Sequence, residues 1–163
     1  MKHVESLRSS VSKNAMLTTM EMVEKLKKFL DPEVELLLTR FMKKGLDANT
    51  FISEEVKRGL TCVCTNCSEN KTIPALINLS NTKSIPGKIN LIVCFDSIIE
   101  KNGNKIFNVR DVDKLIYALV SFMFDSANDV RLDAKSCFCK LYQSCLDPNE
   151  LLKILQIGLN EAI

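Results

Sequence analysis

Apolar residues recur along most of the chain at intervals of three, four and seven, the spacing of a helix face rather than of a strand. Between about Val4 and Lys28 they form one such stripe: Leu7, Val11, Ala15, Met22 and Leu26. The same spacing predicts further helices over about 32–45, 51–67, 72–79, 84–101, 109–124 and 129–145, and another that begins near residue 147. The pattern therefore predicts an all-α fold.

Two of these helices begin with the same tripeptide. Leu-Asp-Pro occurs at 30–32 and again at 146–148. Aspartate accepts hydrogen bonds from the first N–H groups of a helix, and proline is tolerated at the first helical position because it has no N–H to satisfy. We therefore expect Asp31 and Asp147 to cap the helices that follow them, and Gly45 to end the first of these helices.

The predicted helices repeat as pairs. Alternate helices begin near residues 4–7, 51, 84 and 129, a period of roughly 33 to 45 residues. HEAT and armadillo repeats have periods in this range. In such arrays each helix pair buries one face against the next pair. We expect a HEAT/armadillo-like α-solenoid of about four antiparallel helix pairs, in a single domain over residues 1–163.

Composition excludes several function classes. The 5 Gly and 4 Pro in 163 residues are too few for a β-sandwich, which needs frequent turns. A formal net charge of +2 is too small to indicate nucleic-acid binding. No apolar run approaches the roughly 20 residues of a membrane span, and the N-terminal sequence lacks the apolar core of a signal peptide. We expect a cytosolic protein without nucleic-acid or membrane partners, whose 7 cysteines are thiols.

Three cysteines, Cys62, Cys64 and Cys67, lie close together in the sequence. A structural zinc site needs four converging ligands, whereas Cys62 and Cys64 point in nearly opposite directions on a helix. The remaining cysteines offer no matching pair: Cys94, Cys137, Cys139 and Cys145. We expect most of these cysteines to be small buried core residues, and no metal. A thiol sensor that uses Cys62, which faces solvent in this interpretation, is a further alternative.

The sequence contains no recognisable catalytic constellation. It has neither a Gly-rich phosphate-binding loop nor a His-Glu-x-x-His zinc motif. A cysteine nucleophile needs a positioned histidine base, and the single histidine, His3, lies near the N-terminus. We expect a protein that is not an enzyme, with no catalytic residue and no cofactor.

The segment Asp125–Leu141, DSANDVRLDAKSCFCKL, resembles the first helix of a HEAT repeat. In that family an aspartate in the turn between repeats and an arginine early in the helix tie neighbouring repeats together. The resemblance assigns these structural roles to Asp125 and Arg131. The segment Asp47–Leu60 is similar in kind, which assigns Asp47 to the same role as Asp125.

Nearly the whole chain resembles part of a TOG domain, of the type found in CLASP proteins and in crescerin, the TOG array regulator of axonemal microtubules. The resemblance rests on LRSSVS at 7–12, on the helix start DPE at 31–33 and, most specifically, on NTFISEEV at 49–56. IPALINL at 73–79 and DKLIYALVSFMFDSANDVRLDAKSCF at 113–138 fit later repeats of the family in order.

The resemblance implies a flat α-solenoid that binds tubulin or microtubules through loops along one edge. It places such a domain in the cytoskeleton or, for the crescerin type, in the axoneme of a cilium or flagellum, where it would regulate microtubule dynamics or axoneme assembly. The corresponding loops are Leu26–Asp31, Cys67–Thr72, Lys101–Asp111 and Gln143–Pro148. Three of them carry candidate tubulin-binding residues, mostly cations suited to acidic tubulin: Lys27, Lys28, Lys71, Lys101, Asn102 and Lys105.

The chain departs from this family in length. A TOG domain has six repeats, and this sequence accounts for about the last four. It therefore lacks the leading repeats with their exposed aromatic contact, often a tryptophan, and it has no Trp. The first helix then lacks a neighbour, which leaves Leu7, Val11 and Met22 partly uncovered. Self-association, or the docking of further HEAT repeats, is expected through this helix.

An adaptor is the alternative function. A HEAT-repeat adaptor would bind another protein or a peptide through a helical face. Substitution of the loop lysines would then have little effect on binding.

Overall fold

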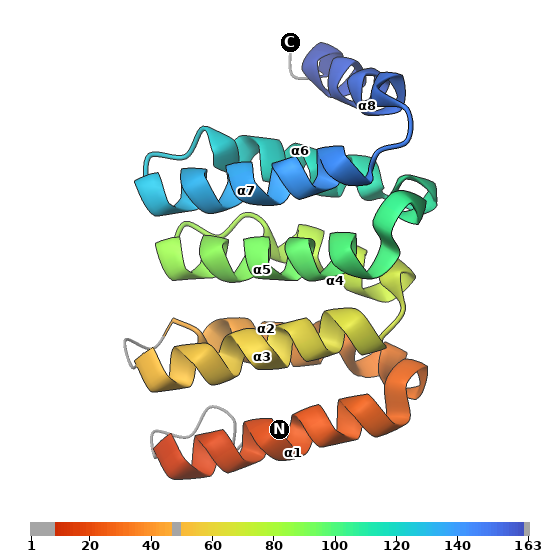
Figure 1. Ribbon diagram of the computed structural model, residues 1–163. Helices are drawn as coiled ribbons and strands as arrows, with labels where there is room; N and C mark the ends of the chain where they lie inside the picture. The colour runs from red at the N-terminus through yellow and green to blue at the C-terminus, as the bar shows by residue number, and fades with distance from the viewer. Residues whose placement is uncertain (1–8, 47–49, 162–163) are drawn as a thin grey trace.

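The computed structural model describes residues 9–46 and 50–161, and the regular elements among them are all helical (Figure 1). These are α1 (Ser9–Leu26), α2 (Val34–Lys44), α3 (Thr50–Asn66), α4 (Glu69–Leu79), α5 (Ile85–Asn102), α6 (Val112–Met123), α7 (Asn128–Ser144) and α8 (Pro148–Glu161), with the short 3-10 helices η2 (Lys27–Glu33) and η3 (Gly103–Asn108). Within the described ranges, no helix has the length and apolar character needed to cross a membrane.

Alternate helices form two layers. α1, α3, α5 and α7 lie side by side in one layer, and α2, α4 and α6 lie behind them in the other (Figure 1). α8 extends the second layer beyond α6. This arrangement confirms the predicted all-α, HEAT-like solenoid of stacked antiparallel helix pairs.

The core lies between the two layers and between neighbours within each layer. Leu38, Phe41, Leu60, Phe95 and Ile116 are among its completely buried side chains. Burial of a side chain of this size contributes about 1.5–3 kcal/mol. Because each helix is buried by its nearest neighbours, stability is distributed along the stack rather than concentrated at one centre.

The predicted stripe of the first helix is an outer face. Val11, Met22 and Leu26 are 36%, 49% and 41% exposed, which confirms that part of α1 is left uncovered; Leu7 lies outside the described residues. The buried face of α1 is displaced by one residue, or about 100°, and consists of Ser12, Met16, Thr19, Met20 and Val23. Uncharged residues cover both faces, so their spacing alone does not show which face is buried.

The two Leu-Asp-Pro segments fold differently. Asp147 caps α8 as expected, because its Oδ1 accepts the N–H of Asn149 at 2.9 Å and the helix begins at Pro148. The expectation for Asp31 is wrong. Its Oδ1 accepts the N–H of Ser68 at 3.0 Å, in the next repeat, while Pro32 lies inside η2 and α2 begins two residues later.

Two glycines are required by close packing rather than by an unusual backbone. Gly45 follows the last residue of α2, as predicted, but its φ of −68° is ordinary for any residue. A Cβ at Gly45 would lie 2.3 Å from Nδ2 of Asn90, and a Cβ at Gly59 would lie 2.3 Å from the ring of Phe41. The absence of a side chain at these positions lets α2, α3 and α5 approach closely.

Ion pairs connect neighbouring repeats. The Nζ of Lys140 on α7 lies 2.7 Å from carboxylate oxygens of both Asp96 and Glu100 on α5. In the turn before α7, the carboxylate of Asp125 pairs with Lys88 on α5 and accepts the N–H of Ala127. These contacts fix the distance between α5 and α7 on the outer surface of their layer.

We predict that Gly59→Ala destabilises the fold by about 1–3 kcal/mol, because the new methyl group would overlap the buried ring of Phe41. The same change in an exposed helix would stabilise it by up to about 1 kcal/mol. Urea unfolding monitored by circular dichroism measures the difference. In a Phe41→Leu background the penalty should shrink, and a stabilising effect in the wild-type background would contradict the packing argument.

We also predict that Asp125 makes stability depend on pH. The hydrogen bond from Lys88, followed by that from Ala127, holds the pKa of Asp125 below its usual value, against the effect of burial. The unfolded chain therefore binds this proton more readily, so the stabilisation is complete above about pH 4 and is lost as the pH falls through the folded pKa.

Asp125→Asn should accordingly lower the urea midpoint at pH 7 and bring it closer to that of the wild type near pH 3. Lys88→Met provides the matched control, because it removes the same pair from the other side. A gap between Asp125→Asn and wild type that is constant from pH 7 to pH 3 would show that this pair does not produce the pH dependence.

Candidate functional site

Four connections lie along one side of the stack, which we call the loop edge. It comprises η2, residues 67–68 between α3 and α4 with the first turn of α4 up to residue 71, residues 103–111 between α5 and α6, and residues 145–147 between α7 and α8. Figure 1 shows them on the right, whereas the connections α4–α5 and α6–α7 lie on the left. The four loops assigned by the resemblance therefore share one edge.

The loop edge concentrates the unusual backbone of the molecule. Lys27, Gly103 and Asp111 have φ values of 47°, 53° and 61°, and they are all the positive-φ residues found in the described part of the chain. A left-handed backbone costs a side-chain-bearing residue roughly 1–2 kcal/mol. Lys27 and Asp111 adopt it where the chain enters η2 and α6. Because this conformation costs free energy locally, the surrounding structure must stabilise both turns.

The second loop is held by its neighbours on both sides. From the first repeat, Asp31 accepts the N–H of Ser68. From the third repeat, Nζ of Lys101 donates to the carbonyl oxygens of Cys67 at 2.8 Å and Cys64 at 3.4 Å, and it lies 2.7 Å from Oε1 of Glu69. A cation at the carbonyl end of α3 also complements the helix dipole.

Two carboxylates of the loop edge, those of Glu69 and Asp111, are paired with lysines of the chain. Burial raises the pKa of Glu69, but the hydrogen bond and charge of Lys101 outweigh this effect and leave the pKa below its usual value. The hydrogen bond from Lys114, at 2.7 Å, likewise lowers the pKa of Asp111, which also lies 3.4 Å from Nε of Arg110. These carboxylates remain ionised at neutral pH and already have cationic partners.

The predicted site residues fall into two groups. Lys27, Lys28, Lys71 and Lys105 are exposed on the loop edge, and no hydrogen bond or ion pair from the described residues engages their ammonium groups. Lys101 and Asn102 are engaged at helix ends. The ammonium group of Lys101 donates to the carbonyl of Cys67, and the amide of Asn102 donates to the carbonyl of Ile98, both at 2.8 Å.

The residues assigned to ties between repeats lie at the opposite edge. Arg131 donates to the carbonyl oxygens of Asp125 and Ser126, both at 2.8 Å, and to Oδ1 of Asn128 at 3.1 Å. Its bonds thus close the turn before α7, while Asp125 reaches the preceding repeat through Lys88. Asp47 lies outside the described residues.

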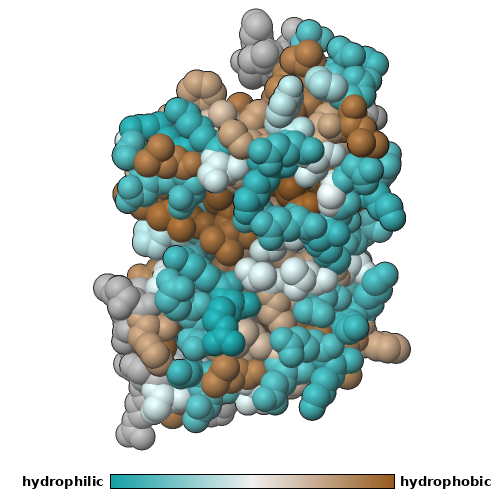
Figure 2. All heavy atoms as spheres, in the orientation of Figure 1, coloured by the Kyte–Doolittle hydropathy of each residue, from teal (hydrophilic) through white to brown (hydrophobic). Residues whose placement is uncertain are grey.

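Two exposed apolar side chains on the loop edge were missed by sequence reasoning. Phe29 in η2 is 89% exposed, and Leu146 in the last loop is 82% exposed. In Figure 2 hydrophilic residues predominate along this edge, and hydrophobic side chains interrupt them near its two ends. Their signal in the sequence is an apolar residue in a connection, outside any helical stripe, which is easily overlooked beside the lysines.

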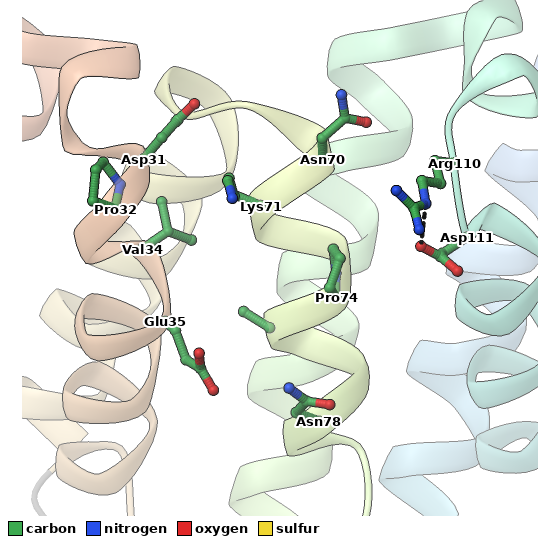
Figure 3. A pocket seen from close by; sticks show the side chains of 11 residues that line it. Asp31, Pro32, Val34, Glu35, Asn70, Lys71, Pro74, Asn78, Arg110 and Asp111 are labelled. Carbon is green, nitrogen blue, oxygen red and sulfur yellow. Dashed lines mark ion pairs between the residues drawn. The ribbon is translucent and has the colours of Figure 1, made fainter.

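A polar cleft of about 430 Å³ opens beside the loop edge. Figure 3 shows it between the N-terminal ends of α2, α4 and α6, with Lys71 near its middle and the Arg110–Asp111 pair at one side. Acidic, basic and uncharged residues line it: Asp31, Pro32, Val34, Glu35, Asn70, Lys71, Pro74, Ala75, Asn78, Arg110 and Asp111. The cleft has no strong net charge, because the basic Lys71 and Arg110 are balanced by the acidic Asp31, Glu35 and Asp111.

Most of the cysteines contribute to the core, whereas Cys139 is exposed and Cys145 is partly buried. Cys64, Cys67 and Cys94 are fully buried, and the described residues contain no cluster of side chains suited to a metal ion. The expectation that Cys62 faces solvent is wrong: it is 8% exposed, and its S–H points at the carbonyl of Met20 on α1. Burial is the largest cause that raises the pKa of Cys62 to about 11, so little of this thiol is in the reactive thiolate form at neutral pH. The thiol-sensor alternative assumed an exposed Cys62 and is therefore not supported.

Comparison with known proteins agrees with this architecture. The family CLASP N terminal matches residues 1–158. The TOG array regulator of axonemal microtubules protein 1 of Mus musculus is 25% identical over 138 residues, covering 80% of this chain and 8% of that protein. The Homo sapiens protein of the same name is 31% identical over 77 residues, covering 47% of this chain and 4% of that protein.

These relatives confirm the resemblance to CLASP and crescerin domains that the sequence motifs indicated, and the chain spans less than a tenth of their length. The family match covers nearly all of the stack, from α1 into α8. With its all-helical, two-layered solenoid, this chain belongs to the CLASP N-terminal family.

Proposed function

We propose that this chain is a TOG-like binding domain, not an enzyme, and that it binds tubulin through the loop edge. Phe29 carries the proposal, because its ring is almost fully exposed in η2 directly beside exposed Lys27 and Lys28. Aromatic residues contribute strongly to protein interfaces when a partner covers them. Membership of the CLASP N-terminal family, and the names of the mouse and human relatives, support tubulin as that partner.

The charges of the loop edge suit an acidic surface such as that of tubulin. Its exposed lysines are available to a partner, whereas Glu69 and Asp111 are already paired within the chain. A row of cations attracts an acidic surface over about 10 Å at 0.1 M ionic strength, which increases the association rate and favours one register of binding. The last loop, without a lysine, offers Leu146 instead.

We further propose the cytoskeleton as the location of the protein, and an axoneme of a cilium or flagellum as its specific setting. The names of both relatives refer to axonemal microtubules. Because this chain matches only 8% and 4% of their lengths, regulation of microtubule dynamics or of axoneme assembly is proposed for a longer array rather than for these repeats alone.

The cleft favours a second candidate function, that of an adaptor. Its polar lining, between the ends of three helices of one layer, could hold an extended peptide. Asn70 and Asn78 on α4 are exposed there and can both donate and accept hydrogen bonds to a peptide backbone. In this case Glu35 and Arg110, rather than the loop lysines, would determine which peptide binds.

The outer face of α1 is proposed to bind a second copy of the chain. Met20 of α1 contacts α3, and Met22 is two residues, or roughly 200°, further around the helix, so it points away from the rest of the stack. A helix packed there would continue the layer. The interface would bury Val11, Met22 and Leu26.

One prediction of the proposed function concerns the loop edge. Phe29→Ala should weaken binding to purified αβ-tubulin at least about tenfold, and combined Lys28→Glu, Lys71→Glu and Lys105→Glu should abolish it without unfolding the chain. Size-exclusion co-elution and a fluorescence titration at low salt and at about 0.3 M salt, where screening is stronger, measure these effects.

The opposite edge supplies matched controls. Phe124 is 81% exposed after α6, and Lys83 is exposed between α4 and α5. Phe124→Ala and Lys83→Glu should leave tubulin binding unchanged. If these controls weaken binding as much as the edge variants do, the loop edge is not the site. If the wild-type chain binds no tubulin at either salt concentration, the adaptor function becomes the better proposal.

Another prediction concerns self-association through α1. Light scattering at high protein concentration should show a dimer for the wild-type chain and a monomer for Met22→Lys, because a charge would then be buried in the apolar interface. Glu24→Lys, an exposed charge change elsewhere on the same helix, is the control and should leave the dimer intact. A monomeric wild-type chain would rule out this interface in solution.

A further inference from the structure

The ammonium group of Lys101 is already bound by acceptors within the chain. A lysine ammonium group carries three N–H donors and no acceptor. The structure places three acceptors around it: the carbonyl oxygens of Cys67 and Cys64, at 2.8 and 3.4 Å, and Oε1 of Glu69, at 2.7 Å. A carboxylate of tubulin would have to displace one of them, and each belongs to the second loop or to the helix end that precedes it.

The contact from the first repeat acts on the same loop. Asp31 Oδ1 accepts the N–H of Ser68, and the carbonyl of Ser68 accepts the N–H groups of Lys71 and Thr72, each at 3.0 Å. The position of Ser68 therefore determines where the first turn of α4 begins. Lys71, which is exposed and projects from that turn into the cleft (Figure 3), moves with it.

We infer that Asp31 and Lys101 are positioning residues, which clamp the second loop between the first and third repeats and thereby orient Lys71. The role in binding rests on the proposed function of the loop edge. The clamp itself is a property of the chain alone. Lys101 thus supports the binding surface from behind, and Lys71 makes the contact.

A contact lysine and a positioning lysine differ in two measurable ways. Removal of a contact cation reduces the salt dependence of binding, because one screened attraction is lost. Removal of a positioning cation together with its paired carboxylate weakens binding but leaves that salt dependence nearly unchanged, because the net charge of the edge is kept. It also loosens the loop when no partner is present, because the hydrogen bonds that hold residues 67–72 are lost.

The experiment begins with the full chain alone. Hydrogen–deuterium exchange measured by mass spectrometry should show residues 67–72 exchanging roughly tenfold faster in Lys101→Met than in the wild type, which corresponds to the loss of about one charged hydrogen bond. Lys105→Met, a neighbouring exposed lysine of the same edge, is the control and should leave this segment unchanged. Far-ultraviolet circular dichroism verifies that the helices are retained.

Asp31 provides an independent test should Lys101→Met fold poorly. Asp31→Ala should accelerate exchange of the Ser68 amide, whereas Asp31→Asn, which keeps an oxygen acceptor, should restore most of the protection. Unchanged exchange at residues 67–72 in both Lys101→Met and Asp31→Ala would overturn the inference, whatever happens with tubulin.

Tubulin titrations then test the link to function. Lys101→Met combined with Glu69→Gln, which keeps the net charge of the edge, should weaken binding severalfold with the salt dependence of the wild type, while Lys71→Met should reduce that dependence. A reduced salt dependence in this double variant would make Lys101 a contact residue and overturn the positioning role. Absence of binding by the wild-type chain would reject the proposed function but would leave the clamp to be decided by the exchange data.

Discussion

Burial between consecutive repeats is the constraint on which this structure depends. No helix pair here can cover its own apolar surface, so α3 is stable because α1 and α5 lie on either side of it, and α5 because of α3 and α7. Close approach therefore matters more than any one large side chain. Gly59 has no side chain because the ring of Phe41 occupies that space. The connections are placed at the edges as a consequence of this packing.

The loop edge follows from the same constraint. When helices alternate in direction within a regular stack, every second connection must lie on the same side. Apolar side chains anchor part of this edge, since Ile106 of η3 is completely buried and Leu30 and Val109 pack against the core. Polar contacts between repeats hold the second loop: Asp31 with Ser68, and Lys101 with the carbonyl end of α3. Asp31, Glu69 and Lys101 are used in these contacts, whereas Lys27, Lys28 and Lys71 remain exposed.

The sequence was sufficient for the class of fold and for most helices, because helical spacing and repeat length are local properties. It could not distinguish the faces of α1, where uncharged residues occupy both the buried stripe around Met16 and the open stripe around Met22. It also could not separate the roles of Asp31 and Asp147, which have the same neighbours in sequence. Asp147 caps its own helix, whereas Asp31 has a following repeat whose N–H it accepts. The exposed position of Phe29 likewise depends on tertiary structure.

The candidate site was thus predictable as a set of loops but not residue by residue. A lysine in a connection looks the same in sequence whether its ammonium group meets water or three protein oxygens. Lys105 and Lys101 are four residues apart and both are exposed, yet only the ammonium group of Lys101 has partners among the described residues, at the end of α3. The difference arises because Lys101 still lies on α5, which packs against α3, while Lys105 lies on η3 beyond that contact. The last turn of a helix therefore supports the adjacent repeat, and the loop beyond it is left for the proposed partner, a division of roles that any repeat flanked on both sides can adopt.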